Sequence, residues 1–240
     1  MKVLIIIPAY NEEENILNTV NKIKNIKSKD IIDYIVINDG SLDNTAKICE
    51  ENNLNVINLV SNLGIGGAVQ TGYKYAYSND YDVAIQFDGD GQHDENYINT
   101  LLEEIKKGAD FVIGSRFIGD ISEFKSSKMR IFGKNILSFI MKLFGGIKIM
   151  DPTSGFRAAN KKVIAIFSKR YPTEYPEPET IVYLNKCHLN IKEVPVKMHE
   201  REHGKSSISP LKSAYYMFSV SLAIIATCLF KKGDKLWVQP

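Results

Sequence analysis

The sequence predicts an α/β fold with a mostly parallel central sheet and helices on both of its faces. Two observations lead to this prediction. Short apolar runs alternate with segments of helical periodicity along the first half of the chain, and each run is followed by a polar cluster. The chain has 240 residues, of which 44% are apolar, so it can bury a sizeable core. Such alternation is typical of a parallel sheet covered by helices.

The expected strands are five apolar runs, at residues 3–7, 31–37, 54–60, 81–87 and 109–115. The expected helices lie between them, at residues 11–26, 41–52, 66–78 and 94–108. Beyond residue 115 the pattern is less regular. We expect a helix over 125–146, a polar turn at 151–157, a loop broken by prolines at 171–179 and a strand that starts near 189.

The charge distribution indicates an anionic partner on one side of the molecule. The net charge is only +2, so no bulk basic field favours nucleic acid as a partner. However, residues 203–233 contain four lysines and no acid, and residues 124–150 contain no acid and six basic residues, namely Lys125, Lys128, Arg130, Lys134, Lys142 and Lys148. The alternative interpretation is two ordinary solvated faces.

Two segments favour contact with a membrane. The helix expected within 124–150 is amphipathic and basic, which is typical of a helix on a membrane surface, although a helix packed on the domain remains the alternative. Residues 213–230 carry no charge but include three serines and a threonine, so they are marginal for a span of about 20 residues. We therefore expect a catalytic domain at 1–208 and, at 209–240, a hydrophobic helix and tail that contacts the membrane or a partner. A buried core helix is the alternative.

The cysteine pattern and the first residues point to the cytosol. Cys49, Cys187 and Cys228 are widely spaced and form no CxxC, so we interpret them as reduced core residues. The opening stretch MKVLIIIPAYNEEEN has too short an apolar run for a secretory signal peptide.

Polar clusters follow all five expected strands. In parallel sheets such loops gather at the carboxyl edge, where ligands bind. Asp88 and Asp90, in DGDGQH after the fourth strand, form a pair of hard oxygen donors that suits Mg²⁺ or Mn²⁺, and Gln92 could add a third oxygen. His93 could also be a ligand, but we interpret it as a surface residue. A calcium loop is excluded because His93 and Asn99 stand where Gly and Glu are needed, and no phosphate-binding P-loop occurs.

The remaining clusters suit a nucleotide. Asp39 could accept hydrogen bonds from ribose hydroxyls or a base edge, while Pro8, Tyr10 and Glu12 could form a wall beside it. The glycines of GIGGA, Gly66 among them, would let backbone approach a ligand at a helix start.

The motifs PAYNEEENI, NDGSLDNT, NLGIGGA, DGDGQ, GSR and DPTSGFR occur in an order and at intervals that resemble family 2 glycosyltransferases. Within that family the chain is most similar to polyprenyl-phosphate hexosyltransferases of the dolichol-phosphate mannose synthase type, over about residues 1–210. The resemblance implies a GT-A fold, a divalent metal (Mg²⁺ or Mn²⁺), a UDP- or GDP-sugar donor and inversion at the anomeric carbon. It also implies work at the cytoplasmic face of the membrane, with a small membrane protein as partner.

The resemblance also implies a role for individual residues. The nucleoside would be held by Pro8, Tyr10, Glu12 and Asp39, and the metal by Asp88, Asp90 and Gln92. Phosphate groups would be met by Arg116, Arg130, Arg201 and Ser206, and the acceptor side would be shaped by Ser154, Gly155 and Arg157. For each arginine, a surface ion pair is the alternative. The residues expected to be catalytic are Asp88, Asp90, Arg116 and Arg201.

The segment YPEPE departs from the synthase pattern and leaves the acceptor open. Glu177 or Glu179 could serve as a general base for a sugar hydroxyl, whereas a lipid phosphate is already anionic and needs none. The expected reaction is transfer of a hexose to undecaprenyl or dolichyl phosphate. The alternatives are transfer to a hydroxyl of a cell-wall or capsule glycan, and a non-catalytic subunit that binds nucleotide sugar. The retained aspartate pair disfavours the last.

Overall fold

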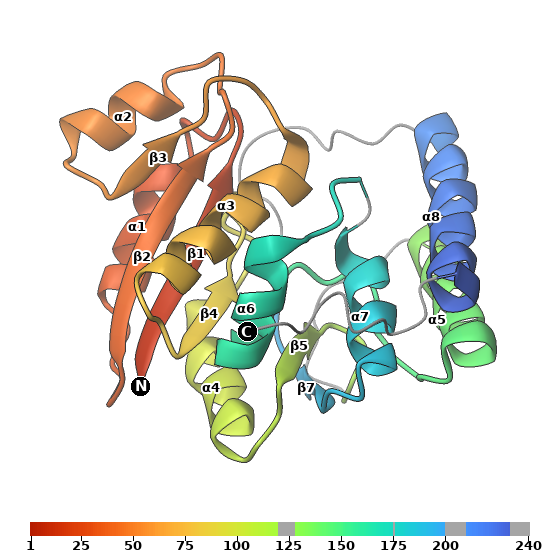
Figure 1. The fold of residues 1–240 in the computed structure, drawn as a ribbon. Coiled ribbons are helices and arrows are strands. Elements are labelled where there is room, and N and C mark those ends of the chain that lie inside the picture. Colours follow the sequence, from red (N-terminus) through yellow and green to blue (C-terminus); the bar gives the residue numbers. More distant parts are fainter. Residues whose placement is uncertain (120–127, 175, 200–209, 231–240) are drawn as a thin grey trace.

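The computed structural model describes residues 1–119, 128–174, 176–199 and 210–230 (Figure 1). Its centre is one sheet of seven strands in the order β3-β2-β1-β4-β6-β5-β7. The strands are β1 (Lys2–Ala9), β2 (Ile31–Asn38), β3 (Val56–Asn58), β4 (Val83–Gln86), β5 (Phe111–Ser115), β6 (Arg157–Asn160) and β7 (Ile191–Pro195). β6 runs antiparallel to both of its neighbours, and the other pairings are parallel. The predicted mostly parallel sheet is therefore confirmed.

Helices cover both faces of the sheet (Figure 1). One face packs on α1 (Ile16–Lys24), α2 (Thr45–Glu51) and α4 (Ile98–Lys106), which follows the short 3-10 helix η1 (Glu95–Tyr97). The other packs on α3 (Gly64–Ser78), α5 (Lys128–Gly145), α6 (Lys161–Lys169), α7 (Pro176–Lys186) and α8 (Pro210–Phe230). Two apolar cores result, one on each side, because strand side chains alternate between the faces.

The second half of the chain corrects one prediction and adds two elements. Residues 171–179 are not all loop, because α7 begins at Pro176. Prolines in a first helical turn are tolerated since those N–H groups have no partner within the helix, and Glu177 and Glu179 there favour the helix dipole. The turn predicted at 151–157 leads directly into β6 and α6, which the sequence did not reveal because β6 has only four residues.

The amphipathic helix α5 divides its apolar residues between two environments. Leu137 and Met141 are fully buried, whereas Phe139 and Leu143 are 63% and 62% exposed. The packed-helix interpretation is therefore confirmed for the buried side of this helix, and the membrane-surface interpretation stays a prediction for its exposed side. α8 lies beside α5 and α7 (Figure 1), and Lys186 Nζ donates to the carbonyls of Thr227 and Cys228 at 2.8 and 2.6 Å.

Within the described residues, no helix combines the length and the apolar character that crossing a bilayer requires. The three cysteines are free thiols.

One buried carboxylate, Asp110, ties the antiparallel part of the sheet together. Its oxygens accept from the side chain of Asn160 at the end of β6 (2.8 Å) and from the backbone N–H of Asn190 before β7 (2.9 Å). Burial alone would raise the pKa of Asp110, but these hydrogen bonds and Lys162 together lower it below its ordinary value of 3.8.

Asp110→Asn should therefore destabilise the fold by about 1–3 kcal/mol at neutral pH, because an amide cannot accept at both atoms. A lowered folded pKa gives stability that is present above the unfolded pKa and lost as pH falls through the folded pKa. Measured by urea unfolding, the difference in free energy of unfolding between wild type and Asp110→Asn should therefore become smaller below about pH 4.

Asp80→Asn is the matched control. Asp80 pairs with Lys161 at 2.6 Å but its side chain is 83% exposed, so this change should have little effect. If the loss in free energy of unfolding caused by Asp110→Asn stayed constant down to pH 3, the charged Asp110 carboxylate would not be the source of that stability.

Candidate active site

A cavity of about 550 Å³ opens at the carboxyl ends of β1, β2 and β4, beside the start of α3. β1 pairs with β2 on one side and with β4 on the other, so the loops that follow these strands meet at one edge. The lining residues are Pro8, Ala9, Tyr10, Glu12, Asp39, Asn62, Gly64, Ile65, Ala68, Asp88, Gly89 and Asp90. The structure thus brings together the side chains that the sequence predicted for the nucleoside and the metal, with two exceptions.

The first exception is Gly66, which lies outside the cavity lining. A Cβ there would run into the backbone carbonyl oxygens of Pro172 and Thr173. Glycine is therefore required for the packing of α3 against this loop, which corrects the expected ligand approach. Gly64 does line the cavity, and its φ of +75° is a conformation that favours glycine.

The second exception is Gln92, which is not among the lining residues. Its backbone N–H donates to Asp90 Oδ1 at 3.1 Å, and its carbonyl accepts from His199 N–H at 2.8 Å. The sequence argument assumed an extended chain from residue 88 to 92. Instead β4 ends at Gln86, and the chain turns through Gly91, whose φ is +75°.

Asp39 is a buried carboxylate in the lining of the cavity. Its Oδ1 accepts from the backbone N–H of Leu63 at 2.7 Å, which holds the chain just before α3. Burial raises the pKa of Asp39, and the N–H groups of Leu63 and Gly64 only partly offset this.

Asp88 and Asp90 both border the cavity from the loop after β4. In the described residues, no group of three or more His, Cys, Asp or Glu side chains is arranged to hold a metal. Two carboxylates beside an open cavity nevertheless fit Mg²⁺ or Mn²⁺, because such ions take one or two carboxylates and complete their shell with phosphate oxygens and water.

His93 is buried and not on the surface, which corrects the sequence interpretation. Its ring stacks on Phe156, with centroids 4.9 Å apart. Nδ1 accepts from the backbone N–H of Asp88 at 3.1 Å, and Nε2 lies 3.5 Å from Asp88 Oδ2. Burial lowers the pKa of His93 and outweighs the opposing charges of Asp88 and Asp90. No local pattern reveals this position, because Phe156 lies 63 residues further along the chain.

Arg116 is engaged in a buried ion pair. Its Nε and one terminal nitrogen donate to the two carboxylate oxygens of Asp151, each at 2.7 Å. Asp151 is fully buried, and its backbone N–H donates to Glu193 at 2.9 Å. Arg116 therefore forms an ion pair, as the alternative interpretation expected, but the pair is buried and does not lie at the surface. Asp151 was missed because a single Asp before proline carries no distinctive signal.

The DPTSGFR segment packs inward and lies against Asp88, which lines the cavity, although no residue of the segment lines the cavity itself. The Ser154 hydroxyl donates to the carbonyl of Gly114 at 2.6 Å. The buried Arg157 guanidinium donates to the carbonyls of Pro152, Ser154 and Glu177 and to Thr180 Oγ1. Gly155 lies against Asp88, since a Cβ there would be 2.7 Å from Asp88 Oδ2.

The structure separates the two glutamates of YPEPE. Glu177 lies within electrostatic range of Arg157 and Asp88, and burial, which is the largest effect, raises its pKa. Glu179 instead lines a different hollow of about 550 Å³ between the 170–174 segment, α7 and α8. Of the other predicted residues, Arg201, Ser206 and the side chain of Arg130 lie outside the described residues.

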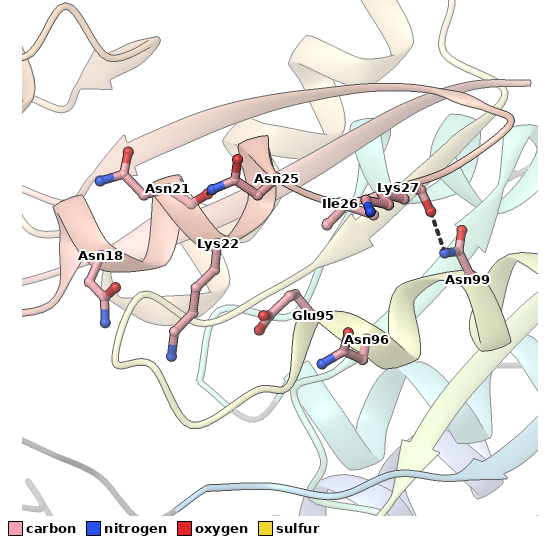
Figure 2. Close-up of a pocket in the computed structure, with 9 residues that line it drawn as sticks. All are labelled: Asn18, Asn21, Lys22, Asn25, Ile26, Lys27, Glu95, Asn96 and Asn99. Atoms are coloured by element: carbon pink, nitrogen blue, oxygen red, sulfur yellow. Dashed lines mark hydrogen bonds between the residues drawn. The ribbon is translucent and has the colours of Figure 1, made fainter.

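A further hollow of about 450 Å³ lies between α1, η1 and α4 (Figure 2). Asn18, Lys22 and Glu95 are among its lining residues, and Asn99 Nδ2 donates to the Lys27 carbonyl there at 3.0 Å. It contains none of the predicted site residues and belongs to the opposite face of the sheet from α3 and α7.

Residues 4–167 match the family described as Glycosyl transferase family 2. A UDP-N-acetylglucosamine--dolichyl-phosphate N-acetylglucosaminyltransferase of Methanococcus voltae is 38% identical over 223 residues, which cover 84% of this chain and 87% of the relative. An undecaprenyl-phosphate mannosyltransferase of Micrococcus luteus is 31% identical over 222 residues, covering 87% and 88%.

Among solved structures, glucosyl-3-phosphoglycerate synthase from Mycobacterium tuberculosis, in complex with Mn²⁺ and UDP-glucose, superposes with a TM-score of 0.69. The identity is 16%, over 95% of this chain and 79% of that one, so the likeness shows the fold alone. The chain belongs to glycosyl transferase family 2, and it resembles the polyprenyl-phosphate sugar transferases within it.

Gly155→Ala tests whether transfer depends on the observed position of Asp88. The added Cβ would displace the Asp88 carboxylate, and a misplacement of this size should lower the kcat of sugar transfer by about tenfold or more. Gly145→Ala is the control, because its Cβ would meet Val182 at an ordinary 3.5 Å. An unchanged kcat for Gly155→Ala, with the protein folded by thermal unfolding, would contradict this expectation.

Proposed function

We propose that this protein is an inverting, metal-dependent glycosyltransferase that moves a hexose-type sugar from a UDP- or GDP-sugar to a polyprenyl phosphate. The observation that carries the proposal is the cavity at the carboxyl edge of the sheet. It is bordered by a buried carboxylate suited to a nucleoside, Asp39, and by the pair suited to a cation and diphosphate, Asp88 and Asp90.

In this proposal the chain's own residues bind and orient the donor. Tyr10, Glu12 and Asp39 hold the nucleoside beside Pro8, and Asp88 and Asp90 would hold Mg²⁺ or Mn²⁺. A divalent cation bound there neutralises the negative charge that grows on the departing nucleoside diphosphate.

The acceptor phosphate needs no general base, because it is already anionic at neutral pH. One of its oxygens forms a bond to the anomeric carbon from the face opposite the diphosphate, as the bond from that carbon to the diphosphate oxygen breaks. The configuration is thereby inverted. The names of relatives that use dolichyl and undecaprenyl phosphate support this acceptor. By the family pattern, Arg116, Arg130, Arg201 and Ser206 would contact phosphate.

A lipid acceptor requires the enzyme to work at a membrane surface. We place it at the cytoplasmic face, with a catalytic domain at 1–208, an interface segment at 124–150 and a C-terminal helix and tail at 209–240 that contact the membrane or a small membrane protein. The exposed apolar residues of α5 and α8, among them Phe139, Leu143, Phe218 and Leu222, support this surface, as does Lys142 beside them.

A second candidate, transfer to a glycan hydroxyl, is favoured by one observation. Glu177 lies within electrostatic range of Asp88, and burial raises the pKa of Glu177. A carboxylate with a raised pKa is a better general base at neutral pH. Glu179, which faces another hollow, does not share this environment.

Replacing both aspartates tests the metal assignment. Asp88→Asn with Asp90→Asn should lower transfer by about a thousandfold, since Lewis-acid stabilisation contributes several kcal/mol. The measurement uses a panel of UDP- and GDP-sugars with undecaprenyl phosphate, read by mass spectrometry. Chelation of the wild type with EDTA should have the same effect and Mn²⁺ should reverse it. Full turnover by the double variant would refute the metal role.

The acceptor class is tested with Glu177→Gln and its control, Glu179→Gln. With polyprenyl phosphate, both variants should keep a kcat within about threefold of wild type, because no proton is removed. If wild type transfers only to a glycan primer, and Glu177→Gln alone lowers that rate by about a hundredfold or more, the hydroxyl candidate replaces the first.

The membrane surface is tested by cosedimentation with anionic lipid vesicles. Phe139→Ser with Leu143→Ser should weaken vesicle binding by about tenfold or more, since each removes a large apolar side chain. Leu42→Ser is the control, because Leu42 is even more exposed, at 87%, but lies in the loop before α2. Equal binding by both variants would contradict the assignment of this surface.

A further inference from the structure

The carboxylate of Asp88 is contacted by two neutral polar side chains from its own segment. Gln86 Nε2 donates to Asp88 Oδ1 at 3.1 Å. His93 approaches from the other side, with Nδ1 on the Asp88 backbone N–H at 3.1 Å and Nε2 at 3.5 Å from Oδ2. Gln86 and His93 are only 1% and 3% exposed, so both contacts are shielded from water.

The contacts of His93 require one form of its ring. Because Nδ1 accepts a hydrogen bond, it carries no hydrogen, and a neutral ring then carries its hydrogen on Nε2, the atom that faces Asp88 Oδ2. A doubly protonated ring would direct an N–H at the Asp88 N–H. The ring is held in place between Phe156, which it stacks on at 15°, and the edge contact with Phe87 at 5.3 Å.

Gln86 is poorly explained by core packing alone. Its Oε1 is buried and has no hydrogen-bond partner among the described residues, and such an orphaned acceptor costs stability. A methionine of similar length would fill the same space without that cost. The amide is therefore best explained by what its other atom does, which is to hold Asp88 Oδ1.

We propose that Gln86 and His93 are positioning residues that fix the Asp88 carboxylate in the orientation needed to bind a divalent cation while leaving its charge available. This inference rests on the proposed metal role of Asp88. An arginine or lysine in their place would orient the carboxylate equally well but would cancel the charge that attracts the cation. Arg116 lies within range of the Asp88 charge, yet its guanidinium is bound by Asp151 at 2.7 Å.

The test measures Mn²⁺ binding directly on the full chain, by electron paramagnetic resonance of free Mn²⁺, alone and with UDP or GDP. Gln86→Met and His93→Phe should each raise the Mn²⁺ dissociation constant by about tenfold or more, as is typical for residues that orient a metal ligand. His93→Gln, which again offers a side-chain N–H donor, should recover part of the affinity that His93→Phe loses. Ile85→Val is the matched control, because it alters the same strand on its opposite face.

Thermal unfolding separates positioning from a structural role. Gln86→Met should melt at the same temperature as wild type or higher, because it removes the orphaned oxygen, while its Mn²⁺ affinity falls. If His93→Phe does not fold, the Mn²⁺ affinity and melting temperature of Gln86→Met still distinguish a positioning role from a structural one.

The outcomes distinguish this inference from the proposed function. If wild type and Asp88→Asn bind Mn²⁺ equally, the metal role of Asp88 is wrong. If Asp88→Asn loses binding but folded Gln86→Met keeps a dissociation constant within about twofold of wild type, the metal role stands and the positioning role is wrong.

Discussion

The arrangement of the site depends on the pairing of β4 with the antiparallel strand β6. Gln86, the last residue of β4, lies opposite Arg157, the first residue of β6. Because β6 runs backwards, the segment that precedes it arrives where the loop after β4 departs. Gly155 therefore rests on Asp88, and Phe156 stacks on His93. A parallel strand in this place would deliver its preceding loop to the far end of the sheet.

The same pairing explains which parts of the molecule could be predicted. The five strands from β1 to β5 follow from local apolar runs, and the parallel order of β1, β2 and β4 then brings Asp39 and Asp88 to one edge. β6 is four residues long, RAAN, with no alternation to reveal it. Asp151 and His93 acquire their partners through this strand, so their burial could not be inferred from residues near them in sequence.

Burial also changed the interpretation of the arginines. A guanidinium in a motif is expected to contact phosphate. The guanidinium of Arg157 instead donates hydrogen bonds to three backbone carbonyls and a threonine hydroxyl. Arg116 is bound in bidentate fashion by a fully buried carboxylate. Removing either partner of such a pair would leave an uncompensated buried charge. Both arginines thus hold loops of the site in place, whatever further contact Arg116 makes.

The charges around Asp88 show how an acidic site can coexist with nearby arginines. If Arg116 or Arg157 were paired with Asp88, the carboxylate would be neutralised and a divalent cation would gain little from it. Instead, Arg116 forms its ion pair with Asp151, and Arg157 donates its hydrogen bonds to backbone carbonyls. Among the described residues, the side chains that contact the Asp88 carboxylate are those of Gln86 and His93, which are neutral in the geometry observed. In the part of the chain that the structure describes, no arginine or lysine is bound to the Asp88 carboxylate, so its negative charge remains available at the cavity that it lines.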